Sequence, residues 1–247
     1  MANQRVSFND VLSFSRASTA TYFDSSGVLQ TAAIDEPRRN HDPVTGEPLG
    51  VLIEPSRTNL LLWSEDFFGW RSIRASVTTN DTESPDGSQS ADKLFENTQT
   101  GEHNARTDIP LVDGGIYSTY IFAKASERSV IQFVAALAFE NGYQNFDLQS
   151  GTLADGTLES EILPLGNGWY RCAVNNLLSS GTSGRVQWNM VTSPSSPRIE
   201  AYTGDGTSGI FIWGAQLEQV SFPTSYIPTA GAPVTRAADI ITTRGDA

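Results

Sequence analysis

The spacing of turn-forming residues between positions 63 and 228 restricts this part of the chain to an all-β fold. Short runs rich in β-branched and aromatic residues, such as 116–123 and 130–137, are separated by Gly, Pro, Asn, Asp and Ser about every 8–12 residues. The run 185–190 alternates apolar and polar residues, and no stretch keeps an apolar period of about 3.6 residues. This pattern predicts a β-sandwich or a β-barrel over residues 63–228.

The two ends of the chain have a different composition. Residues 1–62 carry many Arg, Pro and Gly residues, with a hairpin pattern at 15–33 around the turn signal Asp24–Gly27. They contain too few apolar residues to bury a core alone, so they are predicted to be an extended N-terminal segment for attachment or oligomerisation. Residues 229–247 are small and polar and are predicted to form a C-terminal arm.

Charge and composition exclude several classes of protein. The net charge of -12 repels phosphate backbones, so no nucleic-acid partner is expected. No apolar run approaches the roughly 18 residues of a membrane span, so no membrane insertion is expected. Cys172 is the single cysteine, so the sandwich must be held by packing without a disulfide. The start Met1–Gln4 lacks the basic and apolar regions of a signal peptide.

Three groups of segments together indicate a known family. In chain order they are Phe14–Tyr22 with Leu52–Leu61, Phe146–Thr152 with Gly166–Cys172, and Tyr202–Ile210 with Trp213–Glu218 and Phe222–Thr229. They resemble bacteriophage tail- and head-appendage proteins with a carbohydrate-binding-module-like jelly roll. The resemblance implies that residues 63–228 form a jelly-roll β-sandwich of two antiparallel sheets. The resemblance implies a fibre or decoration protein of the virion, which cell lysis releases without a signal peptide. It also implies a homo-oligomer, a trimer, that contacts other virion proteins and host-surface polysaccharide.

Enzymatic activity is not predicted. The chain has two histidines and no Gly-x-Ser-x-Gly motif. A glycosidase requires only two suitably spaced carboxylates, and the chain has 28 acidic residues, so the number of acids does not rule out such a pair. A polysaccharide-degrading enzyme is therefore kept as the less favoured hypothesis. The main hypothesis is therefore a structural virion protein that attaches to glycans, and the alternative is a stand-alone carbohydrate-binding module.

Aromatic and amide side chains in a predicted loop suggest where a glycan would bind. Tyr143 could stack on a sugar ring while Asn141 and Asn145 bond its hydroxyl groups. Trp70 and Trp188 are alternative stacking residues. For Trp188 a core position is the competing interpretation, because it shares one strand face with Val186 and Met190.

No cofactor is required by the sequence, but a structural Ca²⁺ is a reasonable expectation for a jelly roll of this type. Its ligands would be carboxylates and loop carbonyl groups. The candidate ligands are Glu65, Asp66, Asp86, Asp205 and Glu218. For Asp205 the competing interpretation is a turn in which the carboxylate caps its own backbone.

Overall fold

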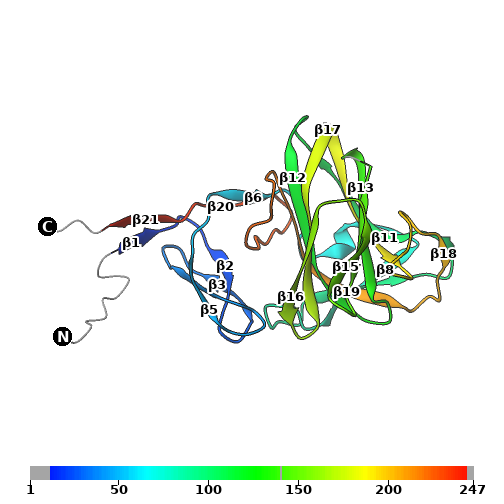
Figure 1. The fold of residues 1–247 in the computed structure, drawn as a ribbon, viewed down its shortest axis with the longest axis horizontal. Coiled ribbons are helices and arrows are strands. Elements are labelled where there is room, and N and C mark those ends of the chain that lie inside the picture. Colours follow the sequence, from blue (N-terminus) through cyan, green and yellow to red (C-terminus); the bar gives the residue numbers. More distant parts are fainter. Residues whose placement is uncertain (1–11, 140, 244–247) are drawn as a thin grey trace.

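The computed structural model describes residues 12–139 and 141–243, and most of them form a sandwich of two antiparallel sheets (Figure 1). The outer sheet has the order β15 (Thr152–Gly156), β14 (Tyr143–Asp147), β13 (Val130–Phe139), β17 (Trp169–Val191), β11 (His103–Pro110) and β7 (Arg71–Ile73). The inner sheet has the order β16 (Ser160–Gly166), β17, β12 (Ile116–Ala125), β19 (Gly209–Glu218), β9 (Ala91–Glu96) and β8 (Ala75–Thr82). The predicted all-β, jelly-roll-like sandwich is confirmed.

Strand β17 belongs to both sheets. Its first part pairs with β12 as far as Leu178, and its second part pairs with β11 from Ser183 onward. The chain therefore crosses from the inner to the outer sheet through residues 179–182 without leaving the strand. The crossing closes one edge of the sandwich.

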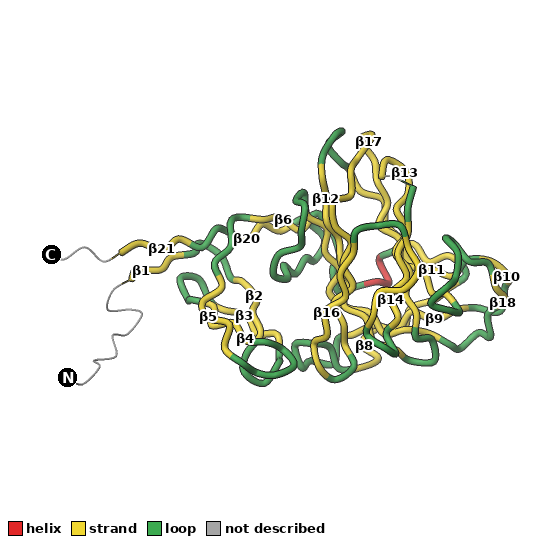
Figure 2. The backbone as a smooth tube through the Cα atoms, in the orientation of Figure 1, coloured by secondary structure: helices red, strands yellow, loops and turns green. Residues whose placement is uncertain are grey.

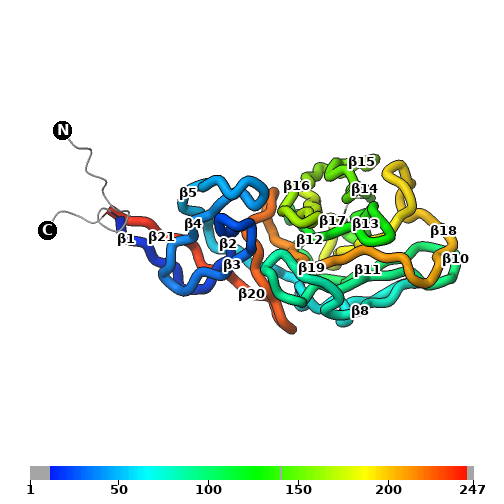
Figure 3. The backbone as a smooth tube through the Cα atoms, turned by 90° about the horizontal axis from the view of Figure 1, so that it is seen from below, coloured from blue at the N-terminus to red at the C-terminus, as the bar shows by residue number. Residues whose placement is uncertain are grey.

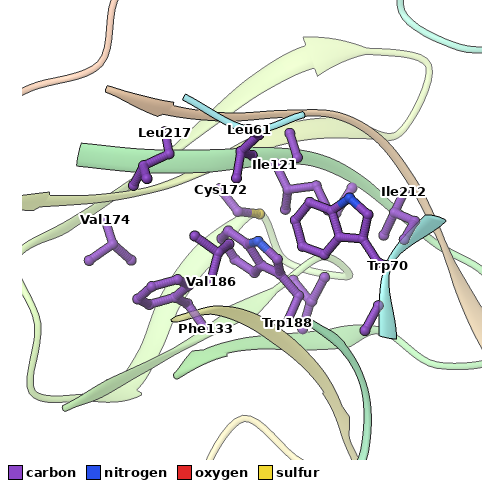
Figure 4. Close-up of a cluster of buried hydrophobic side chains, with 14 of the residues drawn as sticks. Leu61, Trp70, Ile121, Phe133, Cys172, Val174, Val186, Trp188, Ile212 and Leu217 are labelled. Atoms are coloured by element: carbon purple, nitrogen blue, oxygen red, sulfur yellow. The ribbon is translucent and has the colours of Figure 1, made fainter. Parts of the chain in front are cut away.

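The main core lies between the two sheets (Figure 4). Alternation along each strand places one set of side chains inward. Phe133 and Trp188 of the outer sheet meet Ile121 and Cys172 of the inner sheet, and all four are fully buried. Burial raises the pKa of the Cys172 thiol well above its usual value, so this cysteine is an apolar packing residue.

A small lobe is formed by the two ends of the chain together. Its hairpins pair β2 (Ala20–Phe23) with β3 (Leu29–Ala32) and β4 (Arg38–His41) with β5 (Pro48–Leu52). Two further pairs join the chain ends: β1 (Leu12–Ser15) with β21 (Ile240–Thr243), and β6 (Arg57–Asn59) with β20 (Val234–Arg236). The lobe lies at the opposite end of the molecule from the short pair β10 (Thr100–Gly101) and β18 (Tyr202–Thr203) (Figure 2).

An aromatic cluster attaches the lobe to the sandwich. Tyr120, Phe122 and Trp213 project from the face of the inner sheet that points away from the main core, and Leu29 of the lobe and Tyr226 pack against them. The lobe is therefore a third layer on the inner sheet, as Figure 3 shows from below. The predicted segment boundaries at 62/63 and 228/229 stay predictions, and residues 1–11 and 244–247 of these segments lie outside the described residues.

Buried charges hold the two chain ends together inside the lobe. Asp239 accepts from Arg16 Nη1 at 3.0 Å and also pairs with Arg38. Glu54 lies 2.7 Å from Nη1 of both Arg38 and Arg236. The three guanidinium side chains are at most 1% exposed. Burial alone would raise the pKa of Glu54, but Arg236, Ser225 and Arg38 outweigh it and lower that pKa.

Candidate functional site

A groove beside the start of the sandwich combines exposed aromatic rings with carboxylates. It has a volume of about 600 Å³ and lies where the segment 63–68 meets the second half of β8, the beginning of β9 and the segment 229–230. We call it the Trp63 groove. Its lining residues are Trp63, Glu65, Asp66, Phe68, Thr79, Asn80, Ser90, Asp92, Thr229 and Ala230.

The indole ring of Trp63 is held in place but remains accessible. Trp63 is 39% exposed, whereas the other four tryptophans are all buried. Its backbone pairs with Ala230, and its carbonyl oxygen accepts a hydrogen bond of 2.9 Å from Nε1 of Trp70. Cβ atoms at Gly69 and Gly231 would lie only 3.2 and 3.3 Å from the ring, so these glycines allow it to fit closely between two backbone segments. A fixed, exposed ring loses little entropy when a ligand stacks on it.

A second exposed ring comes from a single helical turn. The 3-10 helix η1 (Phe67–Gly69) begins at Asp66, whose side chain accepts from the backbone N–H of Phe68. Phe67 points into the core, which leaves Phe68 76% exposed at the groove. The cap formed by Asp66 therefore fixes a backbone turn that directs the ring of Phe68 toward solvent. Without such a local constraint, a phenylalanine is expected in the interior.

The carboxylates of the groove lie close enough to influence one another. Burial and the nearby charges of Asp86 and Asp92 raise the pKa of Glu65, although a 2.8 Å hydrogen bond from the Tyr226 hydroxyl opposes the shift. Burial, together with Asp66, likewise raises the pKa of Asp92. The side chain of Asp92 accepts from the backbone N–H groups of Phe67 and Asn80, so it connects η1 to β8.

Thr229 places a buried hydroxyl group behind the wall of the groove. It is 6% exposed, and its Oγ1 has no hydrogen-bond partner among residues 12–139 and 141–243. Most buried hydroxyl groups in proteins have a partner. The groove thus provides two stacking rings and several carboxylate acceptors.

The raised pKa of Glu65 leads to a testable pH dependence. A carboxyl whose pKa is higher in the folded than in the unfolded protein destabilises the fold when it is ionised, and the effect disappears as the pH falls through the folded pKa. Glu65→Gln keeps an acceptor for Tyr226 and removes the charge. We expect a higher midpoint of thermal unfolding at neutral pH and no gain near about pH 4, measured by calorimetry. A gain that is equal at both pH values would contradict the assigned cause.

The structure separates the predicted glycan cluster. Asn141 is exposed and Tyr143 is half-buried at the beginning of β14. Asn145 is fully buried: its Nδ2 donates to the carbonyl groups of Pro194 and Ser196, and its Oδ1 accepts from Gln132. Asn145 therefore fixes the loop after β17 and is not presented to a sugar.

The two alternative stacking residues are interior residues. Trp188 is 0% exposed and packs against Phe133 and Phe146, so neither face of its ring is free. Trp70 is 6% exposed and packs against Phe67 beneath the Trp63 groove. The core interpretation of Trp188 is the correct one, and Trp70 supports the groove from below.

The predicted calcium ligands do not form one set. Glu65 and Asp66 lie in the Trp63 groove, while the side chain of Asp86 accepts from Ser84 and Ser88 within its own turn. Asp205 accepts from the backbone N–H groups of Thr207 and Ser208, which is the turn-capping arrangement. Glu218 accepts from the backbone and the hydroxyl group of Thr224. Within the described ranges, no three His, Cys, Asp or Glu side chains are grouped so as to hold a metal ion.

Sequence reasoning placed Glu65, Asp66 and Trp70 among the candidates but missed Trp63 itself. The signal that could have identified it is the pair of aromatic residues Trp63 and Phe68 around two acids in a stretch without strand alternation. Among the described residues, no helix has the length and apolar character required to cross a membrane.

Comparison with known proteins gives no family. No protein-family model and no curated protein matches the sequence. One similar solved structure is TmCBM61 in complex with β-1,4-galactotriose, with 11% identity and a TM-score of 0.40 over 64% of this chain and 97% of that one. Another is the enzymatically active domain of tailspike protein 4 of bacteriophage CBA120, with 17% identity and a TM-score of 0.38 over 64% of this chain and 21% of that one.

A third similar structure is TmCBM27, a carbohydrate-binding module that recognises mannan, with 11% identity and a TM-score of 0.32. It covers 68% of this chain and 97% of that one. The neighbours are thus two carbohydrate-binding modules and a phage tailspike domain. At these low TM-scores the similarities assign neither a family nor a ligand to this chain.

Proposed function

We propose that this chain is a non-enzymatic glycan-binding module and that the Trp63 groove receives the sugar. The observation that carries the proposal is the exposed, rigidly held indole of Trp63 beside carboxylate acceptors. Sugar rings present apolar C–H faces to aromatic rings and hydroxyl groups at their edges. Trp63 and Phe68 would stack on such a face while the carboxylate of Asp66 accepts hydrogen bonds from the edge.

The test is the effect of Trp63→Ala on glycan binding. A glycan array would identify the best-bound oligosaccharide, and titration calorimetry with that compound would give its affinity. We expect Trp63→Ala to weaken binding about 30-fold, equivalent to about 2 kcal/mol, as for other aromatic hot spots. Phe222→Ala is the matched control, because Phe222 is 60% exposed and does not line the groove.

Two other variants distinguish the competing sites and activities. Tyr143→Ala tests the site predicted from the sequence, and a loss of binding in that variant alone would move the site to β14. Release of new reducing ends from the bound oligosaccharide would show hydrolysis and would replace binding with enzymatic activity. Equal affinity in the Trp63→Ala variant and the unmodified protein would remove the groove from consideration.

We further propose that the module belongs to a phage particle and is trimeric. The sequence segments that resemble phage appendage proteins support this role. A second support is the β1–β21 ribbon, in which Leu12 and Phe14 are only half-buried and Ile240 is 55% exposed. A two-stranded ribbon is marginal alone, so ribbons from neighbouring copies or another virion protein would stabilise it. Native mass spectrometry should give three copies, and a monomer at micromolar concentration would contradict the trimer.

A further inference from the structure

The outer sheet carries two adjacent arginines, Arg71 and Arg106, on the face that points away from the core. Arg106 of β11 lies opposite Arg71 of β7 in the antiparallel register. The neighbouring residue Ala105 is buried in the core, so strand alternation directs Arg106 to the opposite face, and Arg71 shares that face as its cross-strand partner. Like charges directly opposite each other destabilise a sheet. A negative charge close to both arginines would therefore stabilise this pair of strands.

Among the described residues, no carboxylate forms a direct ion pair with Arg71 or Arg106, and Glu102 and Asp108 act on Arg106 only from a greater distance. Arg185, nearby on β17, forms a two-point ion pair with Asp108, with distances of 2.6 and 3.1 Å. Over 12–139 and 141–243, neither Arg71 nor Arg106 forms an ion pair, and Nε of Arg106 is buried without a partner. Burial and the charges of Arg185 and Arg71 lower the pKa of Arg106, and the charges of Glu102 and Asp108 only partly oppose that shift.

Amide groups on the same face are also incompletely bonded. Asn104 lies opposite Asn189, one outward-facing pair along from the pair of Arg106 and Gln187. Asn104 and Asn189 are 0% and 1% exposed, yet Oδ1 of Asn104 and Nδ2 of Asn189 have no partner among the described residues. The remaining amide hydrogens are directed mainly to Glu102, which accepts from Asn104 and Gln187 at 3.0 and 3.2 Å. Glu102 is therefore already engaged beside Arg106.

We propose that the outer face of the outer sheet is a second binding site, in which Arg71 and Arg106 hold the anionic group of an acidic saccharide. A guanidinium group presents a planar fork that binds a carboxylate or sulfate through two hydrogen bonds. An anion between the two arginines would remove their mutual repulsion. The site is separate from the Trp63 groove and does not depend on it.

An acidic saccharide fits this site better than a nucleic acid. A nucleic acid is bound by neutralising many phosphates along its backbone, and this chain has a net charge of -12. The face offers two adjacent guanidinium groups that form no ion pair among the described residues, which suits a single isolated anionic group. Carboxylate and sulfate share the required chemistry, so the probes must separate them.

The experiment compares charged and neutral polymers of similar length by titration calorimetry at low salt. Oligogalacturonate tests the carboxylate, dextran sulfate tests the sulfate, and neutral galacto-oligosaccharide and dextran are the matched uncharged probes. We expect one acidic polymer to bind and Arg106→Gln and Arg71→Gln each to weaken that binding about tenfold. Arg39→Gln is the control variant, because Arg39 is an exposed arginine of β4 in the small lobe, and it should change the affinity less than about twofold.

Several results would overturn this inference. One is an unchanged affinity for the acidic polymer in the double variant with Arg106→Gln and Arg71→Gln, and another is an equal loss of affinity in the Arg39→Gln control. The inference would also fail if neither acidic polymer bound, or if a DNA duplex bound more tightly than both polymers. If Arg106→Gln does not fold, Arg106→Lys keeps the charge without the fork and should still weaken binding. Trp63→Ala should leave the affinity for the acidic polymer unchanged. The experiment therefore distinguishes a wrong assignment of the Trp63 groove from a wrong assignment of the arginine site.

Discussion

Replacing Asp239 with asparagine is expected to lower the free energy of unfolding by about 3–5 kcal/mol, because it leaves buried arginines without their counter-charge. Asp239 pairs with Arg16 and Arg38, and all three side chains are 0% exposed. Its side chain also accepts from the backbone N–H of Glu54 at 2.8 Å. Urea denaturation would measure the change.

The control for this substitution is Asp113→Asn, which removes the same charge from an exposed position. A change within about 0.5 kcal/mol is expected there. The pH dependence provides an independent check through Glu54, whose pKa is lowered in the folded protein. Its contribution to stability is present at neutral pH and is lost as the pH falls through that lowered pKa. A stable Asp239→Asn variant would show that the chain ends are held by other contacts.

Replacing Trp188 with alanine is expected to destabilise the sandwich by about 3–5 kcal/mol and to leave the intrinsic affinity of the folded protein for glycans unchanged. The ring fills the main core between Phe133 and Phe146, so its removal leaves a cavity. Trp188→Phe should cost less, because it keeps an aromatic ring and removes an indole N–H that has no partner among the described residues.

Trp63→Ala is the reciprocal control for Trp188. Trp63 is 39% exposed and Trp188 is 0% exposed, so the first substitution should affect binding and the second should affect folding. Thermal unfolding and glycan titration on both variants would separate the two roles. Loss of glycan affinity in a folded Trp188→Ala protein would show that Trp188 takes part in glycan binding.

Strand pattern and turn chemistry are local properties, and the sequence predicts them well. The predicted strands 116–123 and 130–137 lie within β12 and β13, and the turn signal Asp24–Gly27 joins β2 to β3. The capping role of Asp205 follows from its neighbours in the same way. Each of these features depends on residues that are adjacent in the chain.

Features that join distant residues were not predicted. The sequence gives no local signal that Leu12 pairs with Thr243 or that Arg16 meets Asp239 in a buried site. Burial also determines which candidate side chains can contact a ligand. Asn145 and Trp188 lie in the interior, whereas Trp63 lies at the surface. Polar or aromatic character alone does not reveal which of these side chains remains accessible.

The continuous passage of β17 through both sheets has a consequence for how the protein comes apart. Its 23 residues pair with β12 and β16 in one sheet and with β11 and β13 in the other. Peeling β17 away from either sheet therefore withdraws a central strand from the other. The two sheets should melt in one cooperative transition and exchange their amide hydrogens as one unit, with β17 among the slowest to exchange.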